Sequence, residues 1–214
     1  MVPIGGRPLL EHHFELFRRH GVTEFIVNLH HLPETITDHF GDGSRFGVKI
    51  TYSREETLLG TAGAVKKMEA LLRDGPFIVF YGDNLVAADL TALVAFHRQR
   101  KGVATVALWE SPEPWTGGVV ETEADGRIRR FVEKPDRKEV STNLINAGIY
   151  VLEPAVLDTI PAGEFRDFGK DVFPDLLARG AALYAMKPNA YIQDIGTPER
   201  LAKAQRDYET GKVK

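Results

Sequence analysis

Two aspartates are placed where a divalent cation could be held. Asp83 comes just after the unbroken apolar run 77–81, and Asp194 ends a second strand-like segment. In open α/β sheets ligands bind just beyond the carboxyl ends of the strands, and Mg²⁺ takes one or two protein carboxylates plus phosphate oxygens. The pair therefore predicts a Mg²⁺ site. A turn at Gly82-Asp83 and a helix start at Thr197 would account for the same residues without any function.

A run of small residues, Leu59-Gly60-Thr61-Ala62-Gly63, opens a predicted helix. Small residues let a ligand approach the backbone, and free amides at a helix start can bind the polar edge of a nucleotide. We also expect Thr61 to cap this helix and the helix to continue to Leu72. A small-residue loop is weak evidence when taken alone.

Two further motifs carry groups suited to a phosphorylated sugar. Glu133-Lys134-Pro135 offers a carboxylate for hydroxyl groups and a point charge for a phosphate. Asn146-Ala147-Gly148 places an amide beside a position with no side chain. An ion pair before a proline turn, and a simple turn asparagine, are the alternative interpretations. The adjacent pairs His12-His13 and His30-His31 lack the spacing of a metal site on one helical face.

The elements that position these groups alternate between strands and helices. Apolar runs at 25–27, 77–81 and 103–109 predict buried strands, and helical spacing predicts helices from Pro8, from Pro33 and over 90–100. From Gly117 the pattern changes to an antiparallel hairpin, 119–122 with 128–132. Strands at 147–152, 182–186 and 191–195, a helix around Phe173 and a last helix from Pro198 complete the chain. The alternation favours a single α/β domain, three layers deep, with a mainly parallel mixed sheet.

Composition narrows the classes of function. The 214 residues are 43% hydrophobic and 27% charged, which indicates an ordinary globular protein. A net charge of −3 without a basic stripe disfavours nucleic acid as a partner. The absence of cysteine excludes thiol catalysis and disulfides. No apolar run approaches a membrane span and no signal pattern opens the chain, so we expect a cytoplasmic protein that does not contact membranes.

The order of the motifs resembles the sugar-1-phosphate nucleotidyltransferase family over essentially the whole chain. The motifs that carry the resemblance are Gly5-Gly6-Arg7-Pro8-Leu9-Leu10-Glu11, Leu59-Gly60-Thr61-Ala62-Gly63, Gly82-Asp83-Asn84, Glu133-Lys134-Pro135, Asn146-Ala147-Gly148-Ile149-Tyr150 and Asp194-Ile195-Gly196-Thr197-Pro198. The chain looks closest to mannose-1-phosphate guanylyltransferases and glucose-1-phosphate thymidylyltransferases. The fold implied is the Rossmann-like nucleotide-diphospho-sugar transferase fold.

The resemblance also implies roles for individual residues. Asp83 and Asp194 would bind Mg²⁺, and Lys134 would contact the sugar phosphate. The nucleobase would lie against Leu59 and Gly60, with Gly63 in the same loop, and the sugar would contact Gly118, Glu133 and Asn146. The implied reaction joins a nucleoside triphosphate to a sugar 1-phosphate and releases pyrophosphate. Positioning and charge neutralisation dominate such transfers, so no protein nucleophile is needed.

The chain departs from the family at its start. Family members begin with a buried strand and a G-x-G-x-R loop that wraps the triphosphate, and here Met1 stands after both. The resemblance therefore predicts an N-terminally truncated domain whose first strand is missing and whose activity is low, since one lost charge contact typically costs ~10²–10³ in rate. We expect a start placed too late in a longer protein; the alternative is a naturally short relative that binds nucleotide-sugars or serves as a partner subunit. Guanylyl transfer is favoured, with thymidylyl, uridylyl or cytidylyl transfer as the alternatives. The sequence does not decide whether the chain forms a homo-oligomer.

Overall fold

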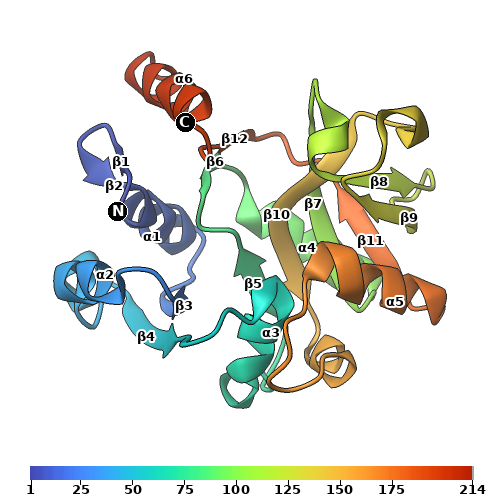
Figure 1. Ribbon diagram of the computed structural model, residues 1–214, viewed down its shortest axis with the longest axis horizontal. Helices are drawn as coiled ribbons and strands as arrows, with labels where there is room; N and C mark the ends of the chain where they lie inside the picture. The colour runs from blue at the N-terminus through green and yellow to red at the C-terminus, as the bar shows by residue number, and fades with distance from the viewer. Residues whose placement is uncertain (214) are drawn as a thin grey trace. The chain divides into compact units, whose positions relative to one another are not determined.

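The computed structural model describes residues 1–213, which divide into two compact units. Unit 1 comprises residues 1–56, 81–91 and 189–213, and unit 2 comprises residues 57–80 and 92–188. Figure 1 labels the elements of both units in chain order.

Unit 1 contains a parallel pair of strands with two helices. Strand β3 (Glu24–Leu29) pairs with β4 (Lys49–Arg54), and the helices are α1 (Leu9–Arg19) and α2 (Pro33–Phe40). Pro33 stands in the first turn of α2, where its missing N–H costs nothing. The rings of Phe14 and Phe40 meet edge to face at 5.3 Å between centroids and form a core with Val48 and Ile50.

In a second part of unit 1, residues 84–87 pair with residues 191–194 near the end of the chain. Strand β6 (Asn84–Ala87) pairs antiparallel with β12 (Tyr191–Asp194), and helix α6 (Pro198–Glu209) follows β12. Two short strands near the N-terminus, β1 (Pro3–Ile4) and β2 (Arg7–Pro8), pair with each other. The apolar cluster that joins these elements is buried and consists of Ile4, Leu9, Leu85, Ile195 and Ala204.

Unit 2 is built on a six-stranded mixed sheet of strand order β11-β7-β10-β8-β9, with β5 also paired to β10. The strands are β5 (Phe77–Phe80), β7 (Ala104–Glu110), β8 (Gly118–Thr122), β9 (Ile128–Glu133), β10 (Leu144–Leu152) and β11 (Leu183–Met186). Strand β10 is antiparallel to β5, β7 and β8, whereas β11 is parallel to β7. Four strands therefore run in one direction, and β9 and β10 run in the other.

Helices accompany this sheet. They are α3 (Gly60–Lys67), α4 (Leu90–Arg100), most of which belongs to unit 2, a π-helix over Phe168–Val172, and α5 (Phe173–Ala178). In Figure 1, α4 lies behind the sheet and α5 in front of it. The rings of Tyr150, Phe168 and Phe173 are fully buried together, with centroids 4.9–5.5 Å apart. Single turns of 3-10 helix occur at 44–46, 69–71, 114–116, 137–139 and, with six residues, 154–159.

The α/β class and the mixed sheet are confirmed, as is the antiparallel hairpin β8–β9. In the sheet of unit 2, β7 and β11 pair in parallel, whereas β10 is antiparallel to its three neighbours, so the pairing is mainly antiparallel and not mainly parallel as expected. Three local predictions are wrong. Helix α3 ends at Lys67 instead of Leu72, and Thr61 does not cap it, because its hydroxyl binds Asp167 instead. Strand β5 is only half-buried, since among the described residues it pairs on one side alone. The single-domain organisation stays a prediction.

Candidate active site

Asp83 and Asp194 lie at the ends of two paired strands in unit 1. Asp194 stands opposite Asn84 in the β6–β12 ladder, and the backbone N–H of Ile195 donates to the carbonyl oxygen of Asp83 at 3.0 Å. The tight turn at Gly82-Asp83 precedes β6, and Asp194 is the last residue of β12. The ladder therefore brings together the two aspartates that the sequence places 111 positions apart.

The surroundings of Asp83, Asp194 among them, disfavour the charged form of its carboxyl group. Although Asp83 is on the surface, nearby protein atoms exclude part of the water around its carboxyl group, and this desolvation raises its pKa. The negative charge of Asp194 raises the pKa of Asp83 further. A divalent cation beside the two carboxylates would favour their charged forms and so oppose this rise in pKa.

Asp194 is held in place by two donors. Its Oδ1 accepts the backbone N–H of Gly196 at 2.6 Å, and its Oδ2 accepts Nη1 of Arg200 at 2.8 Å. Arg200 belongs to the first turn of α6, whose N-cap is Thr197. The side chain of Asp194 is thus fixed by the start of α6.

These two aspartates match the donors that Mg²⁺ uses. Within residues 1–213 there is no cluster of three or more histidine, aspartate or glutamate side chains that could form a complete metal cage. Mg²⁺ needs no such cage, because it commonly binds one or two carboxylates and completes its shell with water and phosphate oxygens. The mutual repulsion of Asp83 and Asp194 fits a site that a cation would stabilise.

His13 supports the segment that carries Asp83, and the sequence analysis did not assign it this role. Its side chain is buried, and Nε2 lies 2.8 Å from the carbonyl oxygen of Asn84. Burial lowers the pKa of His13 to about 4. The imidazole is therefore neutral at pH 7 and donates its Nε2–H to Asn84. The helical spacing of α1 was the available signal, since it places His13 beside the buried Phe14 and Phe17.

Glu133 is the centre of a second group of polar side chains, in unit 2. Burial raises its pKa, the carboxylate of Asp167 raises it further, and Lys134 and Lys170 oppose the shift. A Cβ atom at Gly118 would lie 2.7 Å from Oε2 of Glu133, and one at Gly169 would lie 2.5 Å from it. The two glycines thus make room for the carboxylate of Glu133.

Lys134 has an unusual backbone. Its φ is +47°, in the left-handed region, and its N–H donates to the carbonyl oxygen of Gly117 at 3.0 Å. A residue with a side chain pays of order 1 kcal/mol or more for this conformation. The exposed ammonium group can neutralise a phosphate near Glu133.

Asp167 is a second carboxylate of this group that the sequence analysis missed. Its Oδ1 accepts the N–H groups of Gly169 and Lys170 at 2.9 and 3.3 Å, and its Oδ2 accepts the hydroxyl of Thr61 at 3.0 Å. The sequence signal was the order Asp167-Phe168-Gly169, in which an aspartate precedes helical amides. Asp167 therefore ties the start of α3 to the segment beside Glu133.

The 59–63 loop has a different geometry from the one expected. The amides of Ala62 and Gly63 both donate to the carbonyl oxygen of Arg166, at 2.9 and 3.2 Å, so they are not free to bind a nucleotide. A Cβ atom at Gly60, whose φ is +71°, would lie 2.4 Å from that same oxygen. The glycines allow the chain at 164–166 to pack here, and Leu59 also accepts the N–H of Arg166 at 2.9 Å.

Asn146 is largely committed to the backbone of β10. Its Oδ1 accepts the N–H of Gly148 at 2.8 Å, and its Nδ2 donates to the hydroxyl of Tyr150 at 2.7 Å. The pairing of β10 with β7 is irregular between Asn146 and Tyr150, and Gly148 has a φ of +69° there. Asn146 therefore holds a bulge, and its second amide hydrogen and remaining lone pairs can still face a ligand.

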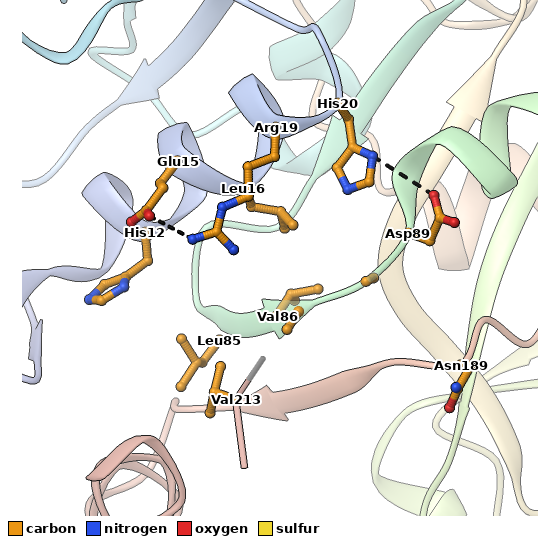
Figure 2. A pocket seen from close by; sticks show the side chains of 12 residues that line it. His12, Glu15, Leu16, Arg19, His20, Leu85, Val86, Asp89, Asn189 and Val213 are labelled. Atoms are coloured by element: carbon orange, nitrogen blue, oxygen red, sulfur yellow. Dashed lines mark hydrogen bonds and ion pairs between the residues drawn. The ribbon is translucent and has the colours of Figure 1, made fainter. Parts of the chain in front are cut away.

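A cavity of about 350 Å³ lies elsewhere in unit 1, between α1 and the strand β6 (Figure 2). Its polar side chains face one another: Glu15 bonds to Arg19 at 2.6 Å, and His20 lies 3.8 Å from Asp89. Asp83 and Asp194 do not line it. The candidate site therefore rests on the strand ends and not on this cavity.

Comparison with known proteins defines the class of protein to which this fold and these residues belong. The chain matches the family described as Nucleotidyl transferase over residues 1–211, and it belongs to that family. The predicted membership of the nucleotidyltransferase family is confirmed.

Individual relatives differ in the substrates that they are named for. The chain is 40% identical over 209 residues to a UTP–glucose-1-phosphate uridylyltransferase of Synechocystis, covering 92% of this chain and 54% of that protein. It is 36% identical over 212 residues to a mannose-1-phosphate guanylyltransferase of Mycobacterium tuberculosis, covering 99% and 58%. The chain thus spans about half the length of the curated relatives it matches.

Solved structures agree on the fold. A putative glucose-1-phosphate thymidylyltransferase from Bacillus anthracis superposes with a TM-score of 0.85 at 24% identity, covering 95% of this chain and 83% of that one. HddC from Yersinia pseudotuberculosis, solved in complex with GMP-PN, gives a TM-score of 0.81 at 26% identity, covering 97% and 88%. Within residues 1–213, no helix is long and apolar enough to cross a bilayer.

Proposed function

We propose that this chain transfers a nucleotidyl group from a nucleoside triphosphate to a sugar 1-phosphate, with release of pyrophosphate. The observation that carries the proposal is the pairing of Asp83 and Asp194 at the ends of β6 and β12. Membership of the nucleotidyl transferase family supports it. A nucleotidyl transfer requires the enzyme to hold a polyphosphate and neutralise its charge, and the two aspartates could do this through a bound cation.

In this proposal Asp83 and Asp194 hold Mg²⁺. The ion would supply charge neutralisation for the phosphates of the triphosphate. Asp194 is oriented for this task by the N–H of Gly196, and the segment of Asp83 is oriented by His13 through Asn84. The protein groups thus provide preorganised ligands.

The residues of unit 2 would bind the sugar phosphate and the base. Glu133 would accept hydrogen bonds from sugar hydroxyls, beside Gly118 and Asn146, and Lys134 would balance the charge of the sugar phosphate. Leu59 would pack against the nucleobase, with Gly60 and Gly63 shaping its loop. The attacking group is the phosphate oxygen of the sugar 1-phosphate, so the protein needs to position it and does not need to form a covalent intermediate.

For the substrate pair we propose GTP and mannose 1-phosphate first. Curated guanylyltransferases from plants and bacteria are 35–38% identical to the chain over 97–99% of its length. UTP and glucose 1-phosphate are the second candidate, because the relative named for them is 40% identical. We further propose that the protein is cytoplasmic. Its oligomeric state can be measured by size-exclusion chromatography with light scattering.

The test is pyrophosphate release by the purified chain with Mg²⁺, using GTP, UTP, dTTP and CTP against mannose and glucose 1-phosphates. We expect Asp83→Asn to lower turnover at least ~100-fold, the usual cost of removing one preorganised charge contact. Asp89→Asn, a change of the same kind at an acidic residue outside the candidate site, should keep wild-type turnover. Equal rates for wild type and Asp83→Asn would refute the proposal. Thermal stabilisation by a nucleotide-sugar without any pyrophosphate release would instead support a non-catalytic binding protein.

A further inference from the structure

Arg200 forms an ion pair with Asp194, one of the two carboxylates that the proposed function assigns to the cation. Its Nη1 donates to Oδ2 of Asp194 at 2.8 Å, while Oδ1 is already engaged by the N–H of Gly196 at 2.6 Å. Both oxygens of Asp194 therefore have protein donors. About 37–38% of each side chain in the ion pair is exposed, so the pair is partly shielded from water.

The position of Arg200 is fixed by the helix that begins beside Asp194. The hydroxyl of Thr197 accepts the N–H of Arg200 at 3.3 Å, as the N-cap of α6. The six-residue spacing between Asp194 and Arg200 thus results from a short turn and the first turn of a helix. The capped first turn of α6 therefore places the guanidinium of Arg200 next to the carboxylate of Asp194.

A guanidinium and a divalent cation cannot share this oxygen without cost. Both are positively charged, and two like charges a few ångströms apart repel even near a protein surface. The guanidinium of Arg200 lies 2.8 Å from Oδ2 of Asp194, so its charge offsets the negative charge of that carboxylate. Arg200 therefore performs, without a cation, part of the neutralisation that a cation would perform.

We propose that Arg200 is a built-in competitor of the divalent cation for Asp194, so that it sets the cation concentration at which the Asp83–Asp194 site fills. This inference rests on the proposed function, because it takes these aspartates as the cation ligands. Cation binding then requires the Arg200–Asp194 ion pair to open. A partly exposed ion pair contributes little to stability, so its opening changes cation affinity by a modest factor.

The test is titration of the whole chain with Mn²⁺, followed by the electron paramagnetic resonance signal of the free ion. Arg200→Gln keeps a hydrogen-bonding side chain but removes the charge, and we expect it to bind Mn²⁺ about threefold to fivefold more tightly than wild type. Arg206→Gln removes the same charge from the exposed last turn of α6 and serves as the matched control, expected to stay within about 1.5-fold of wild type by the screening of distant surface charges. Arg200→Lys keeps the charge and should bind like wild type.

The outcomes separate the two ideas. Equal or weaker Mn²⁺ binding by Arg200→Gln, or tightening of the same size in Arg206→Gln, would overturn the role of Arg200. Asp194→Asn should abolish the Mn²⁺ site, and if it binds as wild type does, the cation assignment of the proposed function fails instead. Circular dichroism of each variant confirms its helix content. If Arg200→Gln is not folded, Arg200→Ala removes the same charge and decides the question by the same comparison with wild type and Arg206→Gln.

Discussion

Replacement of His13 by glutamine should remove a specific part of the pH dependence of stability. His13 is buried in α1 and donates Nε2–H to the carbonyl oxygen of Asn84 at 2.8 Å. Glutamine can donate the same hydrogen bond but does not titrate between pH 4 and 7. The comparison therefore isolates the cost of protonating a buried imidazole.

The expected size follows from the pKa of His13, which burial lowers from 6.5 to about 4. The unfolded chain then binds more protons than the folded protein between these values, so the free energy of unfolding falls as the pH falls through 6.5 toward 4. Between pH 7 and pH 5 the loss from this one group is about 2 kcal/mol, and below pH 4 it levels off at roughly 3.4 kcal/mol, from 1.36 kcal/mol per pKa unit. The acidic groups contribute equally to both proteins and cancel in the comparison.

The assay is urea denaturation followed by far-ultraviolet circular dichroism at pH 7, 6 and 5, for wild type and His13→Gln. We expect wild type to lose about 2 kcal/mol more than the variant between pH 7 and pH 5. His31→Gln, at an exposed histidine of the same unit, controls for loss of an imidazole alone and should behave as wild type does. If wild type and His13→Gln lose the same free energy over this range, His13 is not a buried neutral donor and the reasoning fails.

Two further substitutions test backbone geometry in unit 2. Gly60→Ala places a Cβ atom 2.4 Å from the carbonyl oxygen of Arg166 at a φ of +71°, so it should lower the free energy of unfolding by more than about 2 kcal/mol. The control Gly180→Ala has a φ of +76° but open space around it, so it should lower the free energy of unfolding by about 1 kcal/mol. Equal losses in urea denaturation would show that the contact with Arg166 does not constrain the loop. Lys134→Gly relieves a φ of +47°, so it should leave the stability unchanged or raise it by up to about 1 kcal/mol while pyrophosphate release falls at least ~100-fold. A loss of stability together with retained turnover would argue that Lys134 has a structural role only.

Much of the fold could be predicted from local sequence signals. The helix predicted from Pro33 begins at that residue, and the hairpin predicted at 119–122 with 128–132 is observed as β8 and β9. These signals are local because proline and glycine restrict the backbone wherever they stand, and apolar periodicity follows from burial of one face. The cap at the start of α3 was misassigned for the opposite reason, since the hydroxyl of Thr61 binds Asp167, 106 residues away.

The candidate site was predicted only as far as its residue types. Asp83 and Asp194 could be selected because each follows an apolar strand-like segment, but their contact depends on the β6–β12 ladder, and β6 was not predicted. The supporting roles of His13 and Asp167, which act through long-range contacts, were not predicted. A histidine on an apolar helical face gives no local sign of which carbonyl it will bind.

The sequence by itself determined the class of fold, the family motifs and the chemistry available to each motif, because these depend on residue type, spacing and order. Tertiary structure alone decided which polar groups are free. It paired Asp194 with Arg200, used the amides of Ala62 and Gly63 to bind Arg166, and packed Glu133 between Gly118 and Gly169. The physical reason is that a hydrogen bond or an ion pair is fixed by distances of about 3 Å between atoms, which chain positions far apart in sequence acquire only when the strands and helices have packed.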